Sequence, residues 1–370
     1  MKWFYLTLLV FLVGCSSAVE INKSYNISYK DFEFEVLFDN LKNPWGMSFI
    51  DENNLLVTQK NTGLLIIDLN ERSITDIEGI PRFVHPGQGG MLDVKYYEGF
   101  VYLTYVAQNS GSHSTMLGRG QLDGFKLVEF EVLHESGPAM SGGSHFGSRI
   151  LIYEDKIYYT TGDRGRKDFG ENHVSQDTQN TLGSVIRLYL NGSIPLDNPF
   201  VDNDSVLDEI YTFGHRNPQG ITLNYETGNI LISDHGERDG DEINILRAGA
   251  NYGWPIAHTG CRYGTSLRFA EHPNDLDFVE NPVYYFECGT GGFPPAGMTF
   301  YFGERYKELY GNLLIGNLAG QKLGRFSVND REVEMLSPLF SGERVRDVIV
   351  SLDDYIYFIT DSGKLVKVIS

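Results

Sequence analysis

The chain has 370 residues, a formal net charge of −19, 41 glycines and 13% aromatic residues. The negative charge argues against a nucleic-acid partner, because the phosphates would be repelled. No long segment repeats apolar residues with the 3.6-residue period of a helix, so the composition favours an all-β fold.

The N-terminal residues have the features of an export signal. A charged start at Lys2 precedes an apolar run that is too short for a confident membrane span. Residues 12–15, Leu-Val-Gly-Cys, resemble a bacterial lipobox, which would make Cys15 the lipidated first residue of the mature protein. We therefore expect a signal peptide at 1–14 and a lipidated tether at 15–32. An ordinary signal peptide cut nearby and an uncleaved anchor are the alternatives.

These features also predict a location. The exported chain would lie at the periplasmic face and contact a membrane only through its lipid anchor. Ser16, directly after the lipidated cysteine, is compatible with sorting to the outer membrane of a two-membrane cell. In such an oxidising compartment the remaining cysteines, Cys261 and Cys288, favour a disulfide, with two free thiols as the alternative. A zinc site is disfavoured, since neither has a close Cys or His partner.

One strand–turn–strand pattern recurs six times along the chain. The copies are roughly 45 to 75 residues apart, a period typical of propeller blades with loop insertions. They predict a single six-bladed β-propeller with four-stranded antiparallel blades over residues 33–370, which we take as the catalytic domain. A pair of large β-sandwiches is the alternative, but sandwiches lack this self-similarity. The first strands of the six copies are 45–49, 90–94, 146–150, 220–223, 296–300 and 346–350.

The repeat places particular side chains at one mouth of the central channel. In a propeller the first strand of each blade lines the channel, so residues just ahead of these strands converge near the axis. Several arginines together indicate a bound carboxylate or phosphate, and a histidine beside them can act as a general base. No glycine-rich phosphate loop opens a helix, which disfavours a nucleotide. The residues concerned are Gln88, His145, Arg216, Asn217, Arg344 and Arg346.

An acidic, glycine-broken loop follows the second strand of the fourth copy. Residues 234–244 carry several carboxylates, and residues 251–255, Asn-Tyr-Gly-Trp-Pro, close the loop. Oxygen donors of this kind are suited to a cation such as calcium. A solvated acidic loop without a bound ion is the alternative interpretation.

Seven short motifs in register resemble one known family. The chain is similar to the soluble pyrroloquinoline quinone (PQQ) dependent sugar dehydrogenases, specifically the aldose sugar dehydrogenase branch, from about Leu41 to Val368. Each motif alone is weak, whereas the set in this order is specific. The motifs are Gly87-Gln-Gly-Gly90, His145-Phe-Gly147, Gly162-Asp-Arg-Gly165, Gly214-His-Arg-Asn-Pro-Gln-Gly220, Asp241-Glu-Ile-Asn244, Asn251-Tyr-Gly-Trp-Pro255 and Arg344-Val-Arg-Asp347.

The resemblance implies an activity and a set of roles. PQQ would oxidise an aldose at its anomeric carbon to a lactone, with His145 as the base, Asp163 orienting it and Arg216 stabilising the developing negative charge. An electron acceptor of unknown identity would complete the cycle. The remaining cofactor contacts would come from Gln88, Asn217, Arg344, Arg346, Asn317 and Ala319. The stretch 316–320 lacks the lysine that the glucose-specialised branch places on the quinone, which favours the aldose branch.

The resemblance also implies calcium. The cofactor calcium would bind the backbone carbonyls of Gly236 and Glu237, and a second, structural calcium would bind Glu242 and the Tyr252 carbonyl. Glu237 is a departure, since the family usually has proline there. Two other functions stay open at this point: a non-catalytic propeller lipoprotein that binds a glycan or a protein, and a calcium-dependent lactonase.

Overall fold

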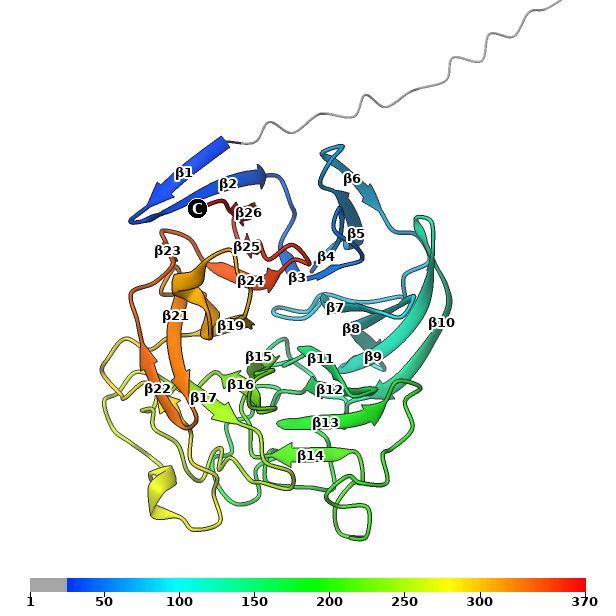
Figure 1. The fold of residues 1–370 in the computed structure, drawn as a ribbon. Coiled ribbons are helices and arrows are strands. Elements are labelled where there is room, and N and C mark those ends of the chain that lie inside the picture. The colour runs from blue at the N-terminus through cyan, green and yellow to red at the C-terminus, as the bar shows by residue number, and fades with distance from the viewer. Residues whose placement is uncertain (1–24) are drawn as a thin grey trace, which may run out of the picture.

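Six antiparallel sheets stand around a common axis in the computed structural model, which describes residues 25–370 (Figure 1). The predicted all-β, six-bladed propeller is therefore confirmed. The predicted signal peptide, the lipidation site at Cys15 and the tether up to residue 24 lie outside the described residues. Among the described residues, no helix is long and apolar enough to span a membrane.

The blades follow one another along the chain. Blade one consists of β3 (Pro44–Phe49), β4 (Asn54–Gln59), β5 (Gly63–Asp68) and β6 (Ser73–Asp76). Blade two consists of β7 (Met91–Tyr97), β8 (Phe100–Asn109), β9 (Ser112–Asp123) and β10 (Lys126–Glu135). Blade three consists of β11 (Ile150–Tyr153), β12 (Lys156–Thr160), β13 (Ser184–Tyr189) and β14 (Ile210–Phe213).

The second half of the chain repeats this plan. Blade four consists of β15 (Pro218–Leu223), β16 (Ile230–Asp234), β17 (Glu242–Ile245) and β18 (Tyr284–Tyr285). Blade five consists of β19 (Pro295–Tyr301), β20 (Asn312–Asn317), β21 (Lys322–Asn329), β22 (Glu332–Met335) and β23 (Phe340–Ser341). Blade six consists of β24 (Val345–Val350), β25 (Ile356–Thr360), β26 (Leu365–Val368), β2 (Phe32–Phe38) and β1 (Tyr25–Tyr29). Two 3₁₀ turns are η1 (Pro273–Asp275) and η2 (Lys307–Leu309).

The ring is closed by strands from the two ends of the described chain. β2 pairs antiparallel with β26, so that Phe34 lies opposite Val368. β1 pairs with β2 and lies within the stretch expected as a tether. Its residues Ile27 and Tyr29 pack against the apolar cluster of blade six. The sheet therefore reaches further toward the N-terminus than the sequence pattern indicates.

Hydroxyl side chains of the second strands join neighbouring blades. Thr160 of β12 accepts a hydrogen bond from the backbone N–H of Arg149 and donates to the carbonyl of Pro218 in blade four, at 2.8 Å. Thr104 does the same between Asp93 and Ser148. The inner strands are bulged, which would leave backbone groups unpaired without these hydroxyls. A repeated threonine therefore fixes the blade spacing on which the channel depends.

One predicted inner strand starts later than expected. Residues 146–149 precede β11, which begins at Ile150. Gly147 (φ 63°), Ser148 (φ 91°) and His145 (φ 49°) have left-handed backbone conformations that a strand does not allow. The apolar pattern therefore predicted an inner strand correctly but placed its start too early in the sequence. His145 lies on a tight turn rather than at the entrance of a strand.

Candidate active site

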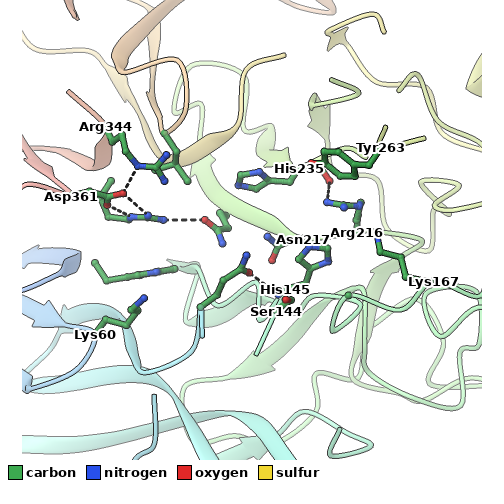
Figure 2. Close-up of a pocket in the computed structure, with 16 residues that line it drawn as sticks. Lys60, Ser144, His145, Lys167, Arg216, Asn217, His235, Tyr263, Arg344 and Asp361 are labelled. Atoms are coloured by element: carbon green, nitrogen blue, oxygen red, sulfur yellow. Dashed lines mark hydrogen bonds and ion pairs between the residues drawn. The ribbon is translucent and has the colours of Figure 1, made fainter. Parts of the chain in front are cut away.

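A cavity of about 550 Å³ opens where the inner strands begin, and we call it the cationic mouth (Figure 2). It is the place at which the repeat predicted convergence, and six of the predicted residues line it. Five of the lining side chains are lysine or arginine. The lining consists of Trp45, Lys60, Gln88, Ser144, His145, Gly165, Lys167, Arg216, Asn217, Gln219, His235, Tyr263, Leu318, Arg344, Arg346 and Asp361.

His145 and Asp163 form a hydrogen-bonded pair at the wall of this cavity. His145 Nδ1 lies 2.6 Å from Asp163 Oδ1. Because an ionised carboxylate only accepts hydrogen bonds, Nδ1 of the neutral imidazole carries the proton. Nε2 is then left as a proton acceptor. The backbone N–H of His145 donates to Gln88 Oε1 at 2.8 Å, which ties the turn to blade two.

Asp163 is fully buried and held from three sides. Its carboxylate also accepts hydrogen bonds from the indole N–H of Trp254 at 2.8 Å and from the backbone N–H of Gly165 at 2.7 Å. Burial opposes ionisation, but the hydrogen bond from His145 and the positive charges nearby outweigh it and hold the pKa of Asp163 below its ordinary value. Asp163 is therefore an ionised group that fixes the orientation of the imidazole.

Arg216 reaches the cavity from the entrance of β15. Its Nη2 lies 2.7 Å from Glu237 Oε2, and both side chains are almost completely buried. Glu237 also pairs with Lys167 at 3.1 Å, so one carboxylate holds two cations from different blades. The Nε of Arg216 is buried without a hydrogen-bond partner in the described structure, as is Nε2 of His235. Such buried unpaired groups are what a ligand would satisfy.

A second carboxylate holds two cations on the opposite wall. Asp361 pairs with Arg344 at 2.7 Å and with Arg346 at 2.8 Å (Figure 2). Burial opposes its ionisation, but the two guanidinium groups hold the pKa of Asp361 below its ordinary value. Lys60 lies beside them, and burial together with the charge of Arg346 lowers its pKa. These contacts leave donor positions of each arginine free for another acceptor.

The lining is thus cationic in a chain whose net charge is −19. Guanidinium groups on two walls match the carboxylates of a polyanionic ligand, and the buried donors without partners point to the same conclusion. The residues present therefore fit the expected PQQ, which carries three carboxylates. The fit rests on Arg216, Arg344 and Arg346 with Lys60 and Lys167 around one cavity.

Two predicted cofactor contacts do not reach the cavity. Asn317 is buried, and its Oδ1 accepts the backbone N–H of Gly320, so its side chain caps a turn. Ala319 is exposed, and Leu318 between them lines the cavity instead. The turn directs only the middle residue inward, which the sequence pattern could not indicate.

The expected cofactor calcium would depend on a tight loop after β16. A Cβ on Gly236 would lie 2.0 Å from the backbone of Gly240, so only glycine allows this close approach. None of the described hydrogen bonds ends on the carbonyl oxygens of Gly236 and Glu237, which leaves them available to a cation. The donor type therefore fits calcium, while the Glu237 side chain is engaged with Arg216 and Lys167.

The expected second calcium falls at a small cavity of about 10 Å³ beside β17. Glu242, Tyr252 and Asp234 line it. Burial and the charge of Asp234 raise the pKa of Glu242 to about 8, and Oδ1 of Asn244 nearby is buried without a partner. Across residues 25–370 no three His, Cys, Asp or Glu side chains form a metal-binding group. Backbone carbonyls would therefore have to complete any calcium site here.

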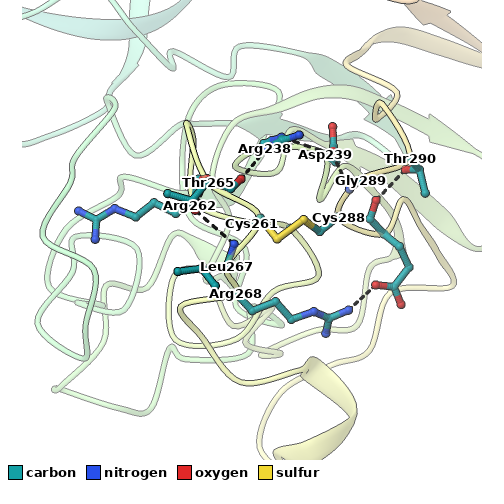
Figure 3. The surroundings of a disulfide bond; sticks show 12 residues. Arg238, Asp239, Cys261, Arg262, Thr265, Leu267, Arg268, Cys288, Gly289 and Thr290 are labelled. Atoms are coloured by element: carbon teal, nitrogen blue, oxygen red, sulfur yellow. Dashed lines mark hydrogen bonds and ion pairs between the residues drawn. A yellow bond between two sulfur atoms is a disulfide. The ribbon is translucent and has the colours of Figure 1, made fainter.

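A disulfide braces the outer side of the same loop. Cys261 and Cys288 are joined at an S–S distance of 2.05 Å (Figure 3). The backbone N–H of Cys261 donates to the carbonyl of Arg238, and that of Gly289 donates to Asp239. The bridge therefore closes the 256–293 segment, which carries the cavity residue Tyr263, and the two hydrogen bonds beside it attach this segment to the turn that follows Glu237.

Several cavity residues follow from a rule that the sequence analysis did not use. In an antiparallel blade the second strand ends beside the start of the first, so residues just after second strands reach the same mouth. Lys60 follows β4, His235 follows β16 and Asp361 follows β25. Trp45 and Trp254 also contribute, since the Trp254 indole donates a hydrogen bond to Asp163 and Trp45 lines the cavity.

The fold and this cavity together define a six-bladed propeller with a cationic mouth and a His–Asp pair. Residues 41–367 match the glucose/sorbosone dehydrogenase family. The aldose sugar dehydrogenase YliI of Escherichia coli is 33% identical over 351 residues, covering 90% of this chain and 92% of that protein.

Solved structures of sugar dehydrogenases have the same fold as this chain. The apo-form crystal structure of the soluble aldose sugar dehydrogenase of Escherichia coli superposes with a TM-score of 0.84 at 31% identity, over 91% of this chain and 99% of that one. The PQQ-bound aldose sugar dehydrogenase of Streptomyces coelicolor has the same fold, with a TM-score of 0.72 at 20% identity over 95% and 99% of the two chains. The chain belongs to the glucose/sorbosone dehydrogenase family and is an oxidoreductase of the sugar dehydrogenase type.

Proposed function

We propose that this protein oxidises aldose sugars at the anomeric carbon to lactones, with PQQ as cofactor and calcium beside it. The observation that carries the proposal is the hydrogen-bonded pair of His145 and Asp163 in the wall of a cationic cavity. The names of the Escherichia coli and Streptomyces coelicolor relatives support the substrate class, and the latter's bound PQQ supports the cofactor.

The protein's share of the chemistry is binding, orientation and proton transfer. PQQ, when bound, supplies the hydride acceptor that amino-acid side chains lack. His145 Nε2 takes the proton of the anomeric hydroxyl, and loss of hydride from the same carbon gives the lactone carbonyl. Asp163 keeps the imidazole in the accepting tautomer and stabilises the imidazolium that forms. Arg216 stabilises negative charge on the cofactor side of the cavity.

The groups around His145 and Arg216 would bind the cofactor and the sugar. Arg344 and Arg346 with Lys60 would hold the cofactor carboxylates, while Asn217 and Gln88 would contact the quinone or the sugar. Calcium at the carbonyls of Gly236 and Glu237 would act as a Lewis acid, and a second ion at Glu242 and Tyr252 would be structural. A non-catalytic propeller is disfavoured, because the residues predicted for the cationic mouth all line its cavity.

The first test is turnover of the mature chain with an aldose panel and a dye acceptor. Four preparations are compared: apoprotein, calcium alone, PQQ alone, and both. We expect turnover only with both, and its loss in His145→Ala while PQQ still binds in an absorbance titration. The absence of any PQQ binding to the wild type would refute the proposal.

We also propose that the chain is exported and anchored through lipidated Cys15, most simply at the outer membrane. The disulfide supports export, because such bonds persist in oxidising compartments. Metabolic labelling with a fatty acid should mark the wild type and leave Cys15→Ala unlabelled. Labelling of both chains, or of neither, would contradict the anchor.

A further inference from the structure

The central channel has a second opening, which we call the opposite mouth. Its cavity of about 240 Å³ is lined by the later residues of the same inner strands whose starts form the cationic mouth. Lys95 to Tyr97 lie in β7, Thr222 in β15 and Thr299 in β19. No residue of this cavity takes part in the dehydrogenase reaction proposed above.

The floor of this cavity is ionic, with one guanidinium shared by two carboxylates. Arg149 Nη1 lies 3.2 Å from Asp93 and 3.1 Å from Asp347, and all three side chains are almost completely buried. The two carboxylates also accept the backbone N–H groups of Ile150 and Met47. The floor therefore carries two carboxylates for one guanidinium, and Lys95, which lines the cavity, is a further cation near Asp347.

The walls are aromatic and hydroxylated. Tyr96, Tyr97 and Tyr225 line the cavity, and Tyr225 is 76% exposed. The ring of Tyr225 packs edge-on against Phe302 at 6.4 Å, and Phe302 packs likewise against Tyr310 at 5.7 Å. The Tyr310 hydroxyl donates to Glu226 at 2.9 Å. Exposed rings held in place by neighbours thus continue from the cavity onto the surface of blade five.

We propose that the opposite mouth binds a neutral oligosaccharide. One sugar ring would occupy the cavity, its hydroxyls bonding to the partly exposed Lys95 and Thr299, and the next unit would stack on Tyr225. Sugar rings present one apolar and one hydroxylated aspect, which matches rigid aromatic side chains beside fixed polar groups. An anion would meet a floor with two carboxylates for one guanidinium, and an apolar ligand would cover Lys95 and Thr299 without giving them polar partners. The site is independent of the proposed oxidation.

The test is binding of sugars that cannot be oxidised. Methyl tetraglycosides of α- and β-linked glucose, mannose and galactose have no free anomeric hydroxyl and are titrated into the purified protein by calorimetry, with and without PQQ and calcium. At least one should bind the wild type. Tyr225→Ala should weaken that binding about tenfold, because it removes a stacking platform. Tyr225→Phe should keep most of it, and oxidation of aldoses should be unchanged in both.

Phe125→Ala is the matched control, since Phe125 is 56% exposed and lies on the outer turn of blade two. Its affinity should equal that of the wild type. The proposal is overturned if no glycoside of the panel binds, or if Tyr225→Ala binds as well as the wild type. It is equally overturned if PQQ competes with the glycoside. PQQ is proposed to bind at the cationic mouth, so it should not affect a glycoside bound at the opposite mouth.

Discussion

The two mouths of the channel are built from the same inner strands, yet their charged side chains differ in how completely they are paired within the protein. At the opposite mouth every polar nitrogen of the Arg149 guanidinium is engaged, with Asp93, Asp347 or backbone carbonyls. At the cationic mouth Nε of Arg216 and Nε2 of His235 are buried without partners in the described structure. The fold itself therefore saturates the Arg149 guanidinium, whereas Nε of Arg216 is left for a ligand to pair.

Asp361 at the cationic mouth and Asp347 at the opposite mouth also differ in the direction in which their pKa values are shifted. Asp361 at the cationic mouth has two guanidinium partners, which hold its pKa below the ordinary value despite burial. Asp347 shares one guanidinium with Asp93, and burial raises its pKa. Two guanidinium groups for one carboxylate thus favour the ionised form of Asp361, whereas one guanidinium for two carboxylates does not offset the burial of Asp347.

The sharpest way to test this contrast is Asp163→Asn. An amide would donate to His145 Nδ1, which moves the ring proton to Nε2 and removes the proton acceptor. We expect kcat to fall by about 10² to 10⁴ with PQQ affinity nearly unchanged. Steady-state kinetics beside a PQQ titration measure both quantities.

Asp347→Asn is the matched control for Asp163→Asn, since it makes the same change in a buried carboxylate at the other end of the channel. Its kcat should stay within a few-fold of the wild type. Equal loss of kcat in the two variants would show that Asp163 acts through general stability rather than through the imidazole.

The second largest effect is expected from Arg149→Met. Removing the shared cation would leave two buried carboxylates facing each other, which costs about 3–5 kcal/mol. Arg119, which pairs with the half-exposed Glu131, is the control, and Arg119→Met should cost about 1 kcal/mol or less. Urea unfolding of both variants gives the comparison. Similar losses would mean that the floor of the opposite mouth is not held by its charges.

A smaller effect on binding, with little effect on folding, is expected from Arg346→Ala. Loss of one charge-assisted contact to a cofactor carboxylate should weaken PQQ binding about 10- to 100-fold. Arg305→Ala removes an arginine that packs on Tyr355 away from the cavity and should leave PQQ affinity unchanged. If both variants bind PQQ equally, the cationic mouth does not hold the cofactor.

Much of the fold could be predicted because the repeat is local. Each copy has its own short strands, tight turns and glycine at the start, so the blade number and most inner-strand positions could be predicted directly, β11 being the exception. Closure by β2 could not be predicted in this way, since it joins residues at the two ends of the described chain. Nor could the left-handed turn at His145, because a positive φ in a non-glycine residue leaves no sequence signal.

The residues of the candidate site also fall into two groups, those that the repeat predicted and those that it did not. Gln88, His145 and Arg216 were found because each precedes a predicted inner strand by a few residues. Lys60 and Asp361 were missed because they follow second strands, although antiparallel pairing brings those ends to the same mouth. The pairing of Glu237 with Arg216 and Lys167 joins three separate loops, and only the folded chain shows it.

The smallest expected effect, a change in the pH dependence of stability, follows from the two carboxylates compared above. The lowered pKa of Asp361 means that its contribution is present above the unfolded value of 3.8 and is lost as pH falls through the folded pKa. The raised pKa of Asp347 means the reverse: its contribution is present below 3.8 and is lost as pH rises through the folded pKa.

Urea unfolding between pH 3 and pH 6 should therefore separate the two variants by sign. Asp361→Asn should lose less stability than the wild type on the acid side, and Asp347→Asn should lose less as the pH rises. Asp123→Asn, an exposed position, should follow the wild-type curve throughout. Parallel changes in both variants would show that the two mouths do not differ in how they balance charge. Opposite changes would tie the contrast to the number of guanidinium groups that each carboxylate faces.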